Sequence, residues 1–365
     1  MRLLLCGGGT AGHINPAIAI AEEMKKSHPD AQILFVGREG GKENDHVLKS
    51  GFKQKTLRVY GLKRSFSLDN LSRVKSAIKA KGEAEKIIKE FKPDVILGTG
   101  GYVCWPVISA GRKLHIPTAI HESNVYPGLT TRLLAKKCDK ILLNREETKK
   151  YLNSKVNTVT VGNPIRADFG RISPRAARAR MGVTEEEILI VSFGGSIGAE
   201  RLNEVIIEVM KEHSSKVPNI KHVHATGRAY FDRAKGELES LKFGGCKIVP
   251  YIDDMPSALL AADIVICRCG AITLSEISAA GVAAILVPSP NVTANHQYKN
   301  ALLLSEHSAA DVIEEKNLSK ESLLNLLKQL EIDKNGRKTR AKNIKAFFTP
   351  NAAKDIVKEL FLLKK

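Results

Sequence analysis

Residues 7–13 (GGGTAGH) combine the residue types of an anion-binding loop with a titratable side chain. Glycine tolerates positive φ angles and lets backbone N–H groups approach a phosphate at the positive end of a following helix. His13 ends this loop, where the field at a helix N-terminus favours the neutral imidazole. A neutral imidazole there could take the proton from an attacking hydroxyl as a general base. The alternative is a histidine that begins a helix and bonds to its own backbone.

The same segment satisfies the spacing Gly-x-Gly-x-x-Gly, which dinucleotide-binding proteins also use. Those proteins carry an acidic residue at the end of the second strand, where it binds a ribose. The corresponding strand here ends in Gly37 and Arg38, without an acid. The sequence therefore argues against an NAD-dependent dehydrogenase, while Arg38 keeps an NADP-dependent one open.

Two more polar loops follow predicted strands in the first half of the chain, at residues 98–103 (GTGGYV) and 121–124 (HESN). In open α/β sheets, ligands collect outside the carboxyl ends of the strands. The three loops are therefore expected to converge on one crevice edge, although each loop taken alone could be an ordinary turn.

The second half carries a comparable loop at residues 194–199 (GGSIGA) and a sharper motif at residues 268–276 (RCGAITLSE). The sharper motif follows an apolar strand and opens a helix, so the first N–H groups of that helix could bind a diphosphate. Glu276, one turn into the helix, could accept hydrogen bonds from both hydroxyls of a ribose. The alternative for Glu276 is an acid that only interacts favourably with the helix dipole.

Further polar residues fit a reaction that needs no metal. Residues 295–297 (NHQ) follow a later strand, and their amide and imidazole groups suit sugar hydroxyls. Asp253 and Asp254 do not form a D-x-D motif and are expected to cap a helix. A departing diphosphate would instead be stabilised by backbone N–H groups and helix dipoles. A single displacement with one base predicts inversion at the sugar carbon.

Short apolar runs alternate with helical patterns along nearly the whole chain, which is typical of parallel sheets covered on both faces. The predicted strands are residues 2–6, 33–36, 95–97, 118–120, 140–143 and 158–161, followed by 188–193, 222–225, 246–250, 264–267 and 284–287. Helical spacing is clearest at residues 16–27, 77–91 and 352–363. Both halves begin with a strand, a glycine loop and a helix. We therefore predict an α/β protein with two Rossmann-like domains that face each other across a cleft.

The turn-rich segment 162–166 (GNPIR) separates the two series of strands, and we place the domain boundary there. We expect domains at residues 1–162 and 163–340, with a C-terminal helical segment at 341–365 that could cross back to the first domain. A chain of 365 residues has the length of two ordinary domains, which agrees with this division.

The composition narrows the classes of function. A formal net charge of +18 suits nucleic acid, an anionic membrane surface or a phosphorylated substrate. Aromatic residues make up only 5% and no nucleic-acid-binding motif is found, so we expect no nucleic-acid partner. No apolar run reaches the ~20 residues of a membrane span, and the first residues lack the features of a signal peptide. The six cysteines form no C-x-x-C pair and are expected to be reduced thiols of a cytosolic protein.

Residues 61–92 are both basic and apolar, with nine Lys or Arg against four acids. Apolar residues are interleaved with these charges at Phe66, Leu68, Leu71, Val74 and Ile78. A surface of this composition can lie on anionic lipid, where each cation contributes about 1 kcal/mol. We expect peripheral membrane attachment through the first domain. The alternative is an ordinary solvated helix whose apolar stripe belongs to the core.

The motifs occur in an order that resembles the MurG family of bacterial peptidoglycan N-acetylglucosaminyltransferases over nearly the whole chain. The matching pieces are GGGTAGHINPAIA, GTGGYVCWP, HESNVYPG, GNPIR, GGSIGAERLN, YIDDMPSALLAAD, CRCGAITLSEI and NHQYKNA. The resemblance implies a GT-B fold and an inverting transfer of GlcNAc from UDP-GlcNAc to lipid I, the muramyl-pentapeptide carried on undecaprenyl diphosphate, which gives lipid II. It also implies peptidoglycan synthesis at the cytoplasmic face of the inner membrane, a role in cell shape and division, and no cofactor.

Carried over by motif position, the resemblance assigns roles to individual residues. The residues that would border the donor sugar and the acceptor diphosphate are Thr10, Ala11 and Gly12. The residues that would bind the donor are Asn124 (sugar), Arg166, Ser196 (diphosphate), Ile252 (uracil edge), Ala271, Ile272, Thr273, Leu274, Ser275 and Glu276 (diphosphate and ribose), and His296 and Gln297 (sugar). His13 would be the base, with Glu122 as the alternative.

The sequence departs from the family pattern at Ser123, where Gln is common, at Cys269, where Ser or Ala is usual, and at residues 281–283 (GVA), where Gly-Leu-Pro is typical. These departures concern packing details. Three other functions compete with the transferase: another GT-B glycolipid synthase that uses a UDP-sugar, a UDP-GlcNAc epimerase of the same double-Rossmann build, and a non-catalytic basic membrane-binding protein. The loops show no carboxylates set for an epimerase's proton abstraction, and a pure membrane binder leaves the ordered glycine loops unexplained.

Overall fold

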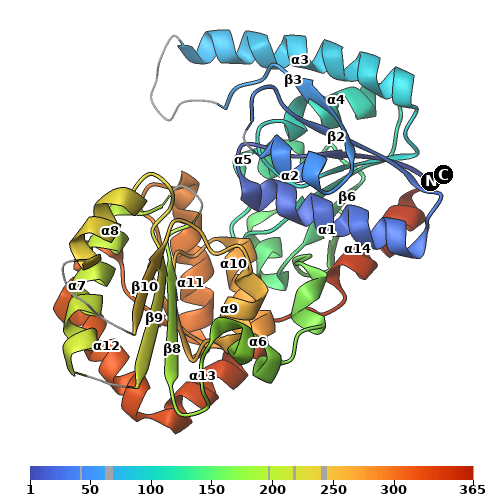
Figure 1. Ribbon diagram of the computed structural model, residues 1–365. Helices are drawn as coiled ribbons and strands as arrows, with labels where there is room; N and C mark the ends of the chain where they lie inside the picture. The colour runs from blue at the N-terminus through green and yellow to red at the C-terminus, as the bar shows by residue number, and fades with distance from the viewer. Residues whose placement is uncertain (42, 62–68, 196–197, 217–218, 240–244, 365) are drawn as a thin grey trace. The chain divides into compact units, whose positions relative to one another are not determined.

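The computed structural model describes residues 1–41, 43–61, 69–195, 198–216, 219–239 and 245–364 (Figure 1). The chain forms two compact units. Unit 1 consists of Met1–Ile165 together with Thr349–Lys365, and unit 2 consists of Arg166–Phe348. Sequence analysis placed the boundary at 162/163 and kept 341–365 apart as a third segment. In the structure, residues 341–348 belong to unit 2, and only the last helix belongs to unit 1.

In the described part of unit 1, seven parallel strands form one sheet in the order β3-β2-β1-β4-β5-β6-β7. Their bounds are β1 Arg2–Cys6, β2 Gln32–Arg38, β3 Lys53–Leu57, β4 Val95–Gly98, β5 Thr118–Glu122, β6 Lys140–Leu143 and β7 Thr158–Thr160. The strand order reverses between β1 and β4, which is where ligands bind in sheets of this kind. The loops predicted to converge follow β1, β4 and β5, so they leave three neighbouring strands at the same edge.

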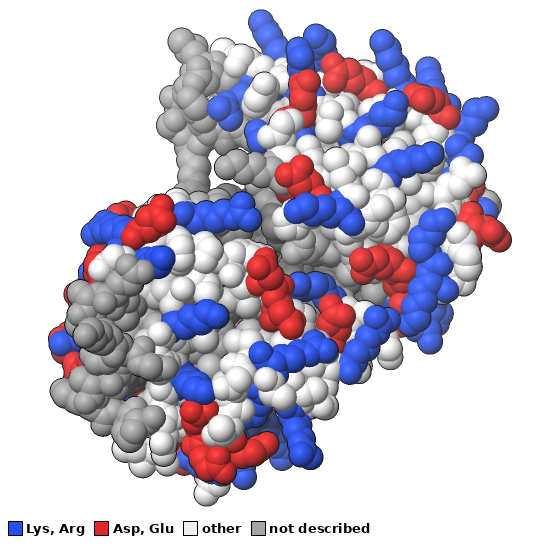
Figure 2. All heavy atoms as spheres, in the orientation of Figure 1, with Lys and Arg blue, Asp and Glu red and all other residues white. Residues whose placement is uncertain are grey.

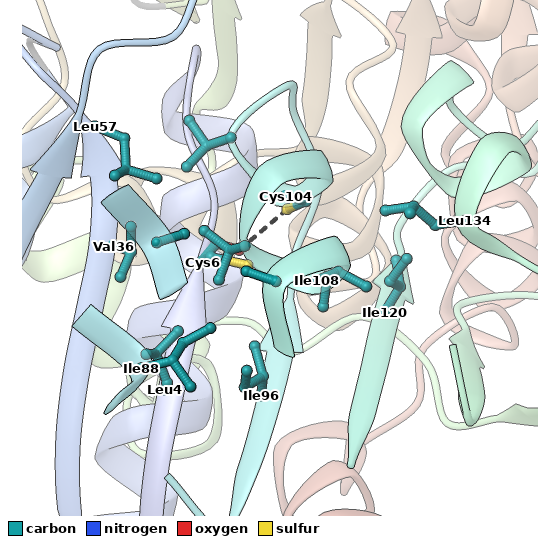
Figure 3. Packing of buried hydrophobic residues seen from close by; sticks show 14 of the residues in the cluster. Leu4, Cys6, Val36, Leu57, Ile88, Ile96, Cys104, Ile108, Ile120 and Leu134 are labelled. Carbon is teal, nitrogen blue, oxygen red and sulfur yellow. Dashed lines mark hydrogen bonds between the residues drawn. The ribbon is translucent and has the colours of Figure 1, made fainter. Parts of the chain in front are cut away.

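Helices cover both faces of this sheet (Figure 1). Their bounds are α1 Ala11–Ser27, α2 Asn44–Lys49, α3 Asp69–Phe91, α4 Cys104–Lys113, α5 Leu129–Leu134, the 3-10 helix η1 Glu146–Tyr151, and α14 Ala352–Leu363. Side chains from α3, α4 and α5 form one hydrophobic cluster with the sheet, part of which Figure 3 shows. Within it the Cys104 thiol donates a hydrogen bond to the carbonyl of Cys6, which ties the start of α4 to the end of β1. The other face packs against α1, α2 and α14.

The last helix, α14, completes the core of unit 1. Ile356, Val357 and Leu360 are buried in the same cluster as the β1 and α1 side chains. An ion pair of 2.6 Å between Lys140 on β6 and Glu359 also joins α14 to the sheet. The chain thus returns to the unit in which it began.

In the described part of unit 2, six parallel strands form a sheet in the order β10-β9-β8-β11-β12-β13. Their bounds are β8 Ile188–Phe193, β9 Ile220–Ala225, β10 Cys246–Val249, β11 Ile264–Cys267, β12 Ala283–Leu286 and β13 Asp311–Val312. The helices are η2 Ala167–Gly170, α6 Pro174–Met181, α7 Glu200–Lys216, α8 Phe231–Glu239, α9 Met255–Ala261, α10 Ala271–Ala280, η3 Thr293–Asn295, α11 His296–Glu306, η4 Glu315–Asn317, α12 Lys320–Ile332 and α13 Lys334–Lys345. The order reverses between β8 and β11, so unit 2 repeats the plan of unit 1. The predicted pair of Rossmann-like α/β domains is confirmed.

Two strands, β3 and β13, were not predicted from the sequence, and the physical reason is the same for both. The sequence of β3 is polar (KQKTL), and only Leu57 in it is buried. The two residues of β13 are both partly exposed. Each strand lies at an edge of its sheet, where backbone pairing holds it without a continuous apolar run. The predicted cap at Asp254 is confirmed, because its carboxylate accepts a hydrogen bond from the N–H of Ser257 in the first turn of α9.

None of the described helices is long and apolar enough to cross a lipid bilayer. All six cysteines are free thiols. Burial raises the pKa of Cys138 to about 12 and that of Cys246 to about 11, so both remain protonated at neutral pH.

Candidate active site

The first two glycine loops of unit 1 touch each other. The side chain of Thr99 donates hydrogen bonds to the carbonyls of Cys6, at 3.3 Å, and His13, at 2.7 Å. A Cβ atom added to Gly101 would lie 2.0 Å from the carbonyl oxygen of Gly8, and Gly101 has a φ of +83°. Only glycine therefore allows the two loops to approach this closely. The predicted convergence of loops 7–13 and 98–103 is present.

The His13 imidazole lies against the second loop. A Cβ atom on Gly100 would come within 2.5 Å of Nδ1 of His13, and Gly100 has a φ of +112°. His13 is half-buried at the beginning of α1, whereas Gly9, Thr10 and Gly12 before it are exposed. The structure thus places one imidazole beside exposed loop backbone at the carboxyl ends of β1 and β4. Ala11, which lies between Thr10 and Gly12 in the sequence, is the first residue of α1.

The Glu122 carboxylate is occupied within its own loop. It is 5% exposed, and its Oε1 accepts from both the backbone and the side-chain N–H groups of Asn124, at 3.0 and 3.1 Å. Its Oε2 accepts from the N–H of Gly128, at 2.9 Å, and the hydroxyl of Thr131, at 2.6 Å. A carboxylate that already accepts four hydrogen bonds holds the loop in shape. Its geometry gives it no free position from which to receive a substrate proton.

The rest of the third loop is similarly fixed. The buried His121 bonds through Nε2 to the carbonyl of Gly162, at 2.9 Å, and burial lowers its pKa. The carbonyl of Ser123 accepts from the side-chain amides of Asn144 and Asn163. Asn124 is partly buried, and its NH2 group faces Glu122. The third loop is therefore held in shape by contacts that sequence spacing alone does not reveal, and none of these contacts joins it to the first two loops.

Tyr102 is a site residue that the sequence reading passed over. Its ring lies against both Gly9 and Gly61, where added Cβ atoms would be 3.1 and 2.9 Å away from ring carbons. Burial raises the pKa of Tyr102; the nearby charges of Arg38 and Arg73 oppose this shift, and that of Glu43 adds to it. The signal available in the sequence was an aromatic residue within the second glycine loop, directly after its last glycine.

In unit 2, the start of α10 is the place where the sequence predicts a diphosphate site. Gly270 is its N-cap, and the first turn is formed by Ala271, Ile272 and Thr273, which are partly exposed. Leu274 is buried, and the hydroxyl of Ser275 turns back to the carbonyl of Ala271, at 3.1 Å. Of the predicted binding residues in this helix, Ala271, Ile272 and Thr273 are therefore partly accessible to a ligand. Leu274 and Ser275 are buried and pack inside unit 2.

Glu276 lies one turn further along, and its side chain is 13% exposed. Burial raises its pKa to about 7, and the positive charge of Arg166 opposes that rise. The guanidinium Nη2 of Arg166 lies 3.6 Å from Oε1 of Glu276. Arg166 is the first residue of unit 2 and leads into η2, which packs on α9 and α10. The structure thus brings two predicted donor-binding residues together that are far apart in the sequence.

Gln297 links the ends of β11 and β12. Its side-chain oxygen accepts from the N–H of Cys269, at 3.2 Å, and from that of Ser289, at 2.9 Å. Its NH2 group makes no hydrogen bond to another described residue. His296 is partly exposed beside it and bonds through Nδ1 to the carbonyl of Thr293, at 2.8 Å.

Two residues in strained conformations precede this pair. Ala294 and Asn295 have φ angles of 53° and 50°, in the left-handed region that residues other than glycine seldom adopt. Such strain persists where the surroundings over-determine the backbone, and it clusters at functional sites.

Two predicted donor residues of unit 2 remain. Ser196 lies outside the described residues. Ile252 is buried between the end of β10 and the beginning of α9. The described glycines of the loop keep the expected geometry, since Gly195 and Gly198 have φ angles of +91° and +87°.

A buried polar network supports this loop from within unit 2. The Ser192 hydroxyl lies 2.8 Å from both Nε2 of His222 and Nδ1 of His224. Nε2 of His224 lies 3.1 Å from Oδ1 of Asn203, whose NH2 group donates to the carbonyl of Thr226, at 2.9 Å. Nδ1 of His224 also lies 3.2 Å from the carbonyl oxygen of Ser192, and burial lowers the pKa of His224 to about 4, which keeps it neutral. The network ties β8 and β9 to the first turn of α7, directly after the loop.

Two family models match the chain. The glycosyltransferase family 28 N-terminal domain matches residues 3–143, and the glycosyltransferase family 28 C-terminal domain matches residues 189–358. A protein of Acetivibrio thermocellus named UDP-N-acetylglucosamine–N-acetylmuramyl-(pentapeptide) pyrophosphoryl-undecaprenol N-acetylglucosamine transferase is 43% identical over 363 residues, which cover 99% of this chain and 98% of the relative. A Pediococcus pentosaceus protein with the same name is 39% identical over 357 residues, 98% of each chain.

Solved structures show the same relationship. Acinetobacter baumannii MurG superimposes with a TM-score of 0.79 at 26% identity and covers 99% of both chains. A UDP-GlcNAc 2-epimerase from Neisseria meningitidis has a TM-score of 0.68 at 14% identity, covers 99% of this chain and 100% of its own, and shares the fold alone. With both family models matched and curated relatives near 40% identity over almost their whole length, the chain belongs to glycosyltransferase family 28 and, within it, to the MurG family of N-acetylglucosaminyltransferases.

Proposed function

We propose that the protein transfers GlcNAc from UDP-GlcNAc to the muramyl-pentapeptide carried on undecaprenyl diphosphate, forming lipid II. The observation that carries this proposal is the start of α10, where the partly exposed first turn lies one turn from the largely buried Glu276 carboxylate. Helix N–H groups suit a diphosphate and a carboxylate at that distance suits a ribose, which together describe a nucleoside diphosphate. The names of the relatives supply the identity of the sugar and of the acceptor.

Unit 2 is the donor half in this proposal. Ala271, Ile272 and Thr273 offer N–H groups to the diphosphate of UDP, and the Glu276 carboxylate accepts from the ribose hydroxyls. The free NH2 group of Gln297 donates to a hydroxyl of GlcNAc beside His296. Arg166 contacts the donor from its place beside Glu276. Ile252 and Ser196 keep their expected roles at the uracil edge and the diphosphate.

Unit 1 is the acceptor half. The exposed backbone of Thr10 and Gly12 borders the acceptor diphosphate, and His13 is the base. The acceptor hydroxyl oxygen attacks the anomeric carbon of GlcNAc as its proton passes to the His13 imidazole. The bond from that carbon to the UDP oxygen breaks, and UDP leaves with the electron pair, stabilised by the N–H groups of α10. Attack opposite the leaving group inverts the anomeric carbon. Glu122 acts through its loop, which it holds for Asn124.

The proposal is tested by transfer itself. Radiolabelled UDP-GlcNAc and a short-chain lipid I analogue are incubated with the protein, and label is measured in the extracted lipid. We expect label to enter the lipid without added metal, and UDP-galactose to serve poorly as donor. Label that stays in the aqueous phase would disprove the central claim, whereas efficient use of UDP-galactose would favour a different glycolipid synthase.

We further propose that unit 1 lies on the anionic cytoplasmic face of the inner membrane through α3. Leu71, Val74 and Ile78 on this helix are 63%, 47% and 59% exposed, although they are large and apolar. Lys75 and Lys79, which directly follow Val74 and Ile78, are exposed as well. Figure 2 shows Lys and Arg side chains projecting from the part of unit 1 where Figure 1 places α3. The opposite side of the helix packs in the core through Ala80, Ala84 and Ile88.

Two of the acids on α3 pair with lysines of other elements. Glu85 pairs with Lys113 of α4 at 3.0 Å, and Glu90 pairs with Lys55 of β3 at 3.9 Å. The Arg73 side chain does not add to the exposed cations of this surface, because its guanidinium donates to the carbonyl of Gly61. Lys63, Arg64, Phe66 and Leu68, which the sequence reading included in the membrane surface, lie outside the described residues.

Charge reversal on α3 tests the attachment. We expect the double variant Lys75→Glu/Lys79→Glu to bind vesicles that contain anionic phospholipid at least tenfold more weakly, because each lysine near such a surface contributes about 1 kcal/mol. Co-sedimentation with the vesicles measures this binding. The control is Lys26→Glu/Lys49→Glu on α1 and α2, which pack on the other face of the sheet. Equal binding by both double variants would contradict attachment through α3.

A further inference from the structure

Glu43 makes a contact that its position in the sequence does not predict. It is the N-cap residue of α2, where an acidic side chain ordinarily accepts a hydrogen bond from the first turn of its own helix. It makes no such bond here. Its Oε1 instead accepts from the backbone N–H of Gly9, at 2.6 Å, across 34 residues of sequence. The carboxylate thus bonds to the first glycine loop rather than to its own helix.

The carboxylate lies in a niche that glycines make possible. Glu43 is 8% exposed. A Cβ atom on Gly8 would be 3.3 Å from its Oε1, and one on Gly41 would be 2.7 Å from that atom. Side chains at either position would therefore displace it. The surroundings fit a carboxylate in one orientation, so it is a permanent part of the loop's environment.

The backbone that carries Glu43 is itself fixed to the sheet. The NH2 group of Asn44 donates to the carbonyl of Arg38 at the end of β2, at 2.7 Å. Gln54 on β3 donates to Oδ1 of Asn44, also at 2.7 Å. The hydrogen bond to Gly9 therefore connects the loop after β1 to the two strands on one side of it.

This contact determines how Gly9 is held. The N–H of Gly9 is directed to the carboxylate, its Cα lies against the ring of Tyr102, and its φ is +92°. Gly9 and Thr10 remain exposed. A run of three glycines has wide conformational freedom, and ordering it on ligand binding would cost free energy. A carboxylate that anchors Gly9, the last glycine of the run, removes much of that cost before the ligand arrives.

We propose that Glu43 is a positioning residue of the acceptor site, which holds the Gly9 peptide so that the backbone from Thr10 to Gly12 is ready for the acceptor's diphosphate. This inference rests on the proposed function, in which that backbone borders the acceptor. Glu43 touches neither substrate. Its effect should therefore appear mainly in the KM for the lipid-linked acceptor, because the residues expected to bind the UDP part of the donor belong to unit 2.

Two substitutions separate the hydrogen bond from the charge. Glu43→Gln keeps an oxygen that can accept from Gly9, and Glu43→Ala removes it. We expect Glu43→Ala to raise the KM for a short-chain lipid I analogue about tenfold, the size of losing one charge-assisted hydrogen bond. The KM for UDP-GlcNAc and kcat should stay within about twofold, and Glu43→Gln should stay within about threefold of the wild type throughout. The matched control is Glu39→Ala, because Glu39 is exposed and pairs with Arg58 at 2.5 Å, away from the loop.

Hydrogen exchange gives a second readout that needs no activity. Peptides that cover residues 5–14 should exchange faster in Glu43→Ala than in the wild type, and Glu43→Gln should restore the protection. A Glu43→Ala variant that matches Glu39→Ala in both measurements would overturn the proposal. So would a lower acceptor KM in both Glu43 variants, since the carboxylate would then compete with the acceptor. If the wild type transfers no label to lipid, the proposed function fails, while the exchange data still decide whether Glu43 holds the loop.

Discussion

Replacing His13 with alanine lowers kcat by a factor of about 10² to 10⁴, while the KM for UDP-GlcNAc stays within about twofold of the wild-type value. The size is that of a positioned general base, which takes the hydroxyl proton only as the new bond forms. The imidazole lies against Gly100 in unit 1, whereas the residues expected to bind the UDP part of the donor belong to unit 2, so the affinity for the donor should change little. Steady-state transfer to a short-chain lipid I analogue, with each substrate varied in turn, measures both parameters.

The control for His13 is His46→Ala, since His46 is exposed on α2 in the same unit. We expect this variant to be fully active. An unchanged kcat in His13→Ala would show that another group is the base. The alternative from the sequence is Glu122. Substituting Glu122 should differ from substituting His13, because Glu122→Gln would disturb four hydrogen bonds within its loop. Its main effect should be a lower melting temperature.

Replacing Glu276 with alanine weakens UDP binding by about 100-fold and raises the KM for UDP-GlcNAc to a similar extent. A carboxylate that accepts from two ribose hydroxyls makes two charge-assisted hydrogen bonds, each of which contributes about 1.5–3 kcal/mol. At saturating donor, kcat should change by no more than about threefold, because the contact exists before and during the reaction. Titration calorimetry with UDP measures the affinity. A variant that binds UDP normally would remove Glu276 from the donor site.

The elevated pKa of Glu276, about 7, adds a pH dependence to the same prediction. Above this pH the carboxylate is charged and accepts from both hydroxyls, and below it the protonated group loses that ability. UDP affinity should therefore fall as the pH drops from 8 to 6, approaching tenfold per unit at the lower end. The charge of Arg166 lowers this pKa, so Arg166→Ala should move the midpoint to higher pH. Arg180→Ala, whose guanidinium lies 3.6 Å from Asp254, is the control. A constant affinity across this range would contradict the assignment.

The framework of both units could be predicted from sequence because buried parallel strands are continuous apolar runs. β1, β6, β8 and β11 were predicted with the bounds that the structure has. The edge strand β3 has only one buried side chain, so its sequence carries no such signal. Loop positions followed directly from the strands, since parallel strands direct their carboxyl ends to one edge.

The roles of individual side chains within the loops were harder to predict. Glu122 and Gln297 both follow strands and both look like ligand-binding groups, yet the structure uses their oxygen atoms to bind neighbouring backbone. Glu43 lies between polar residues after β2, and nothing in the local sequence marks it as a partner of Gly9. These contacts join residues on different loops. They depend on how the strands are ordered in the sheet, which local spacing does not encode.

Unit 1 is assembled from both ends of the chain, and this affects how the protein can fold during its synthesis. Unit 2 is one continuous stretch that ends at Phe348, so all of it leaves the ribosome before the last helix does. Unit 1 lacks Ile356, Val357 and Leu360 until residues 349–365 are made, and the part of α1 that packs against α14 stays uncovered until then. The second unit can therefore reach its native state first, which reverses the usual order in which the N-terminal domain folds before the rest.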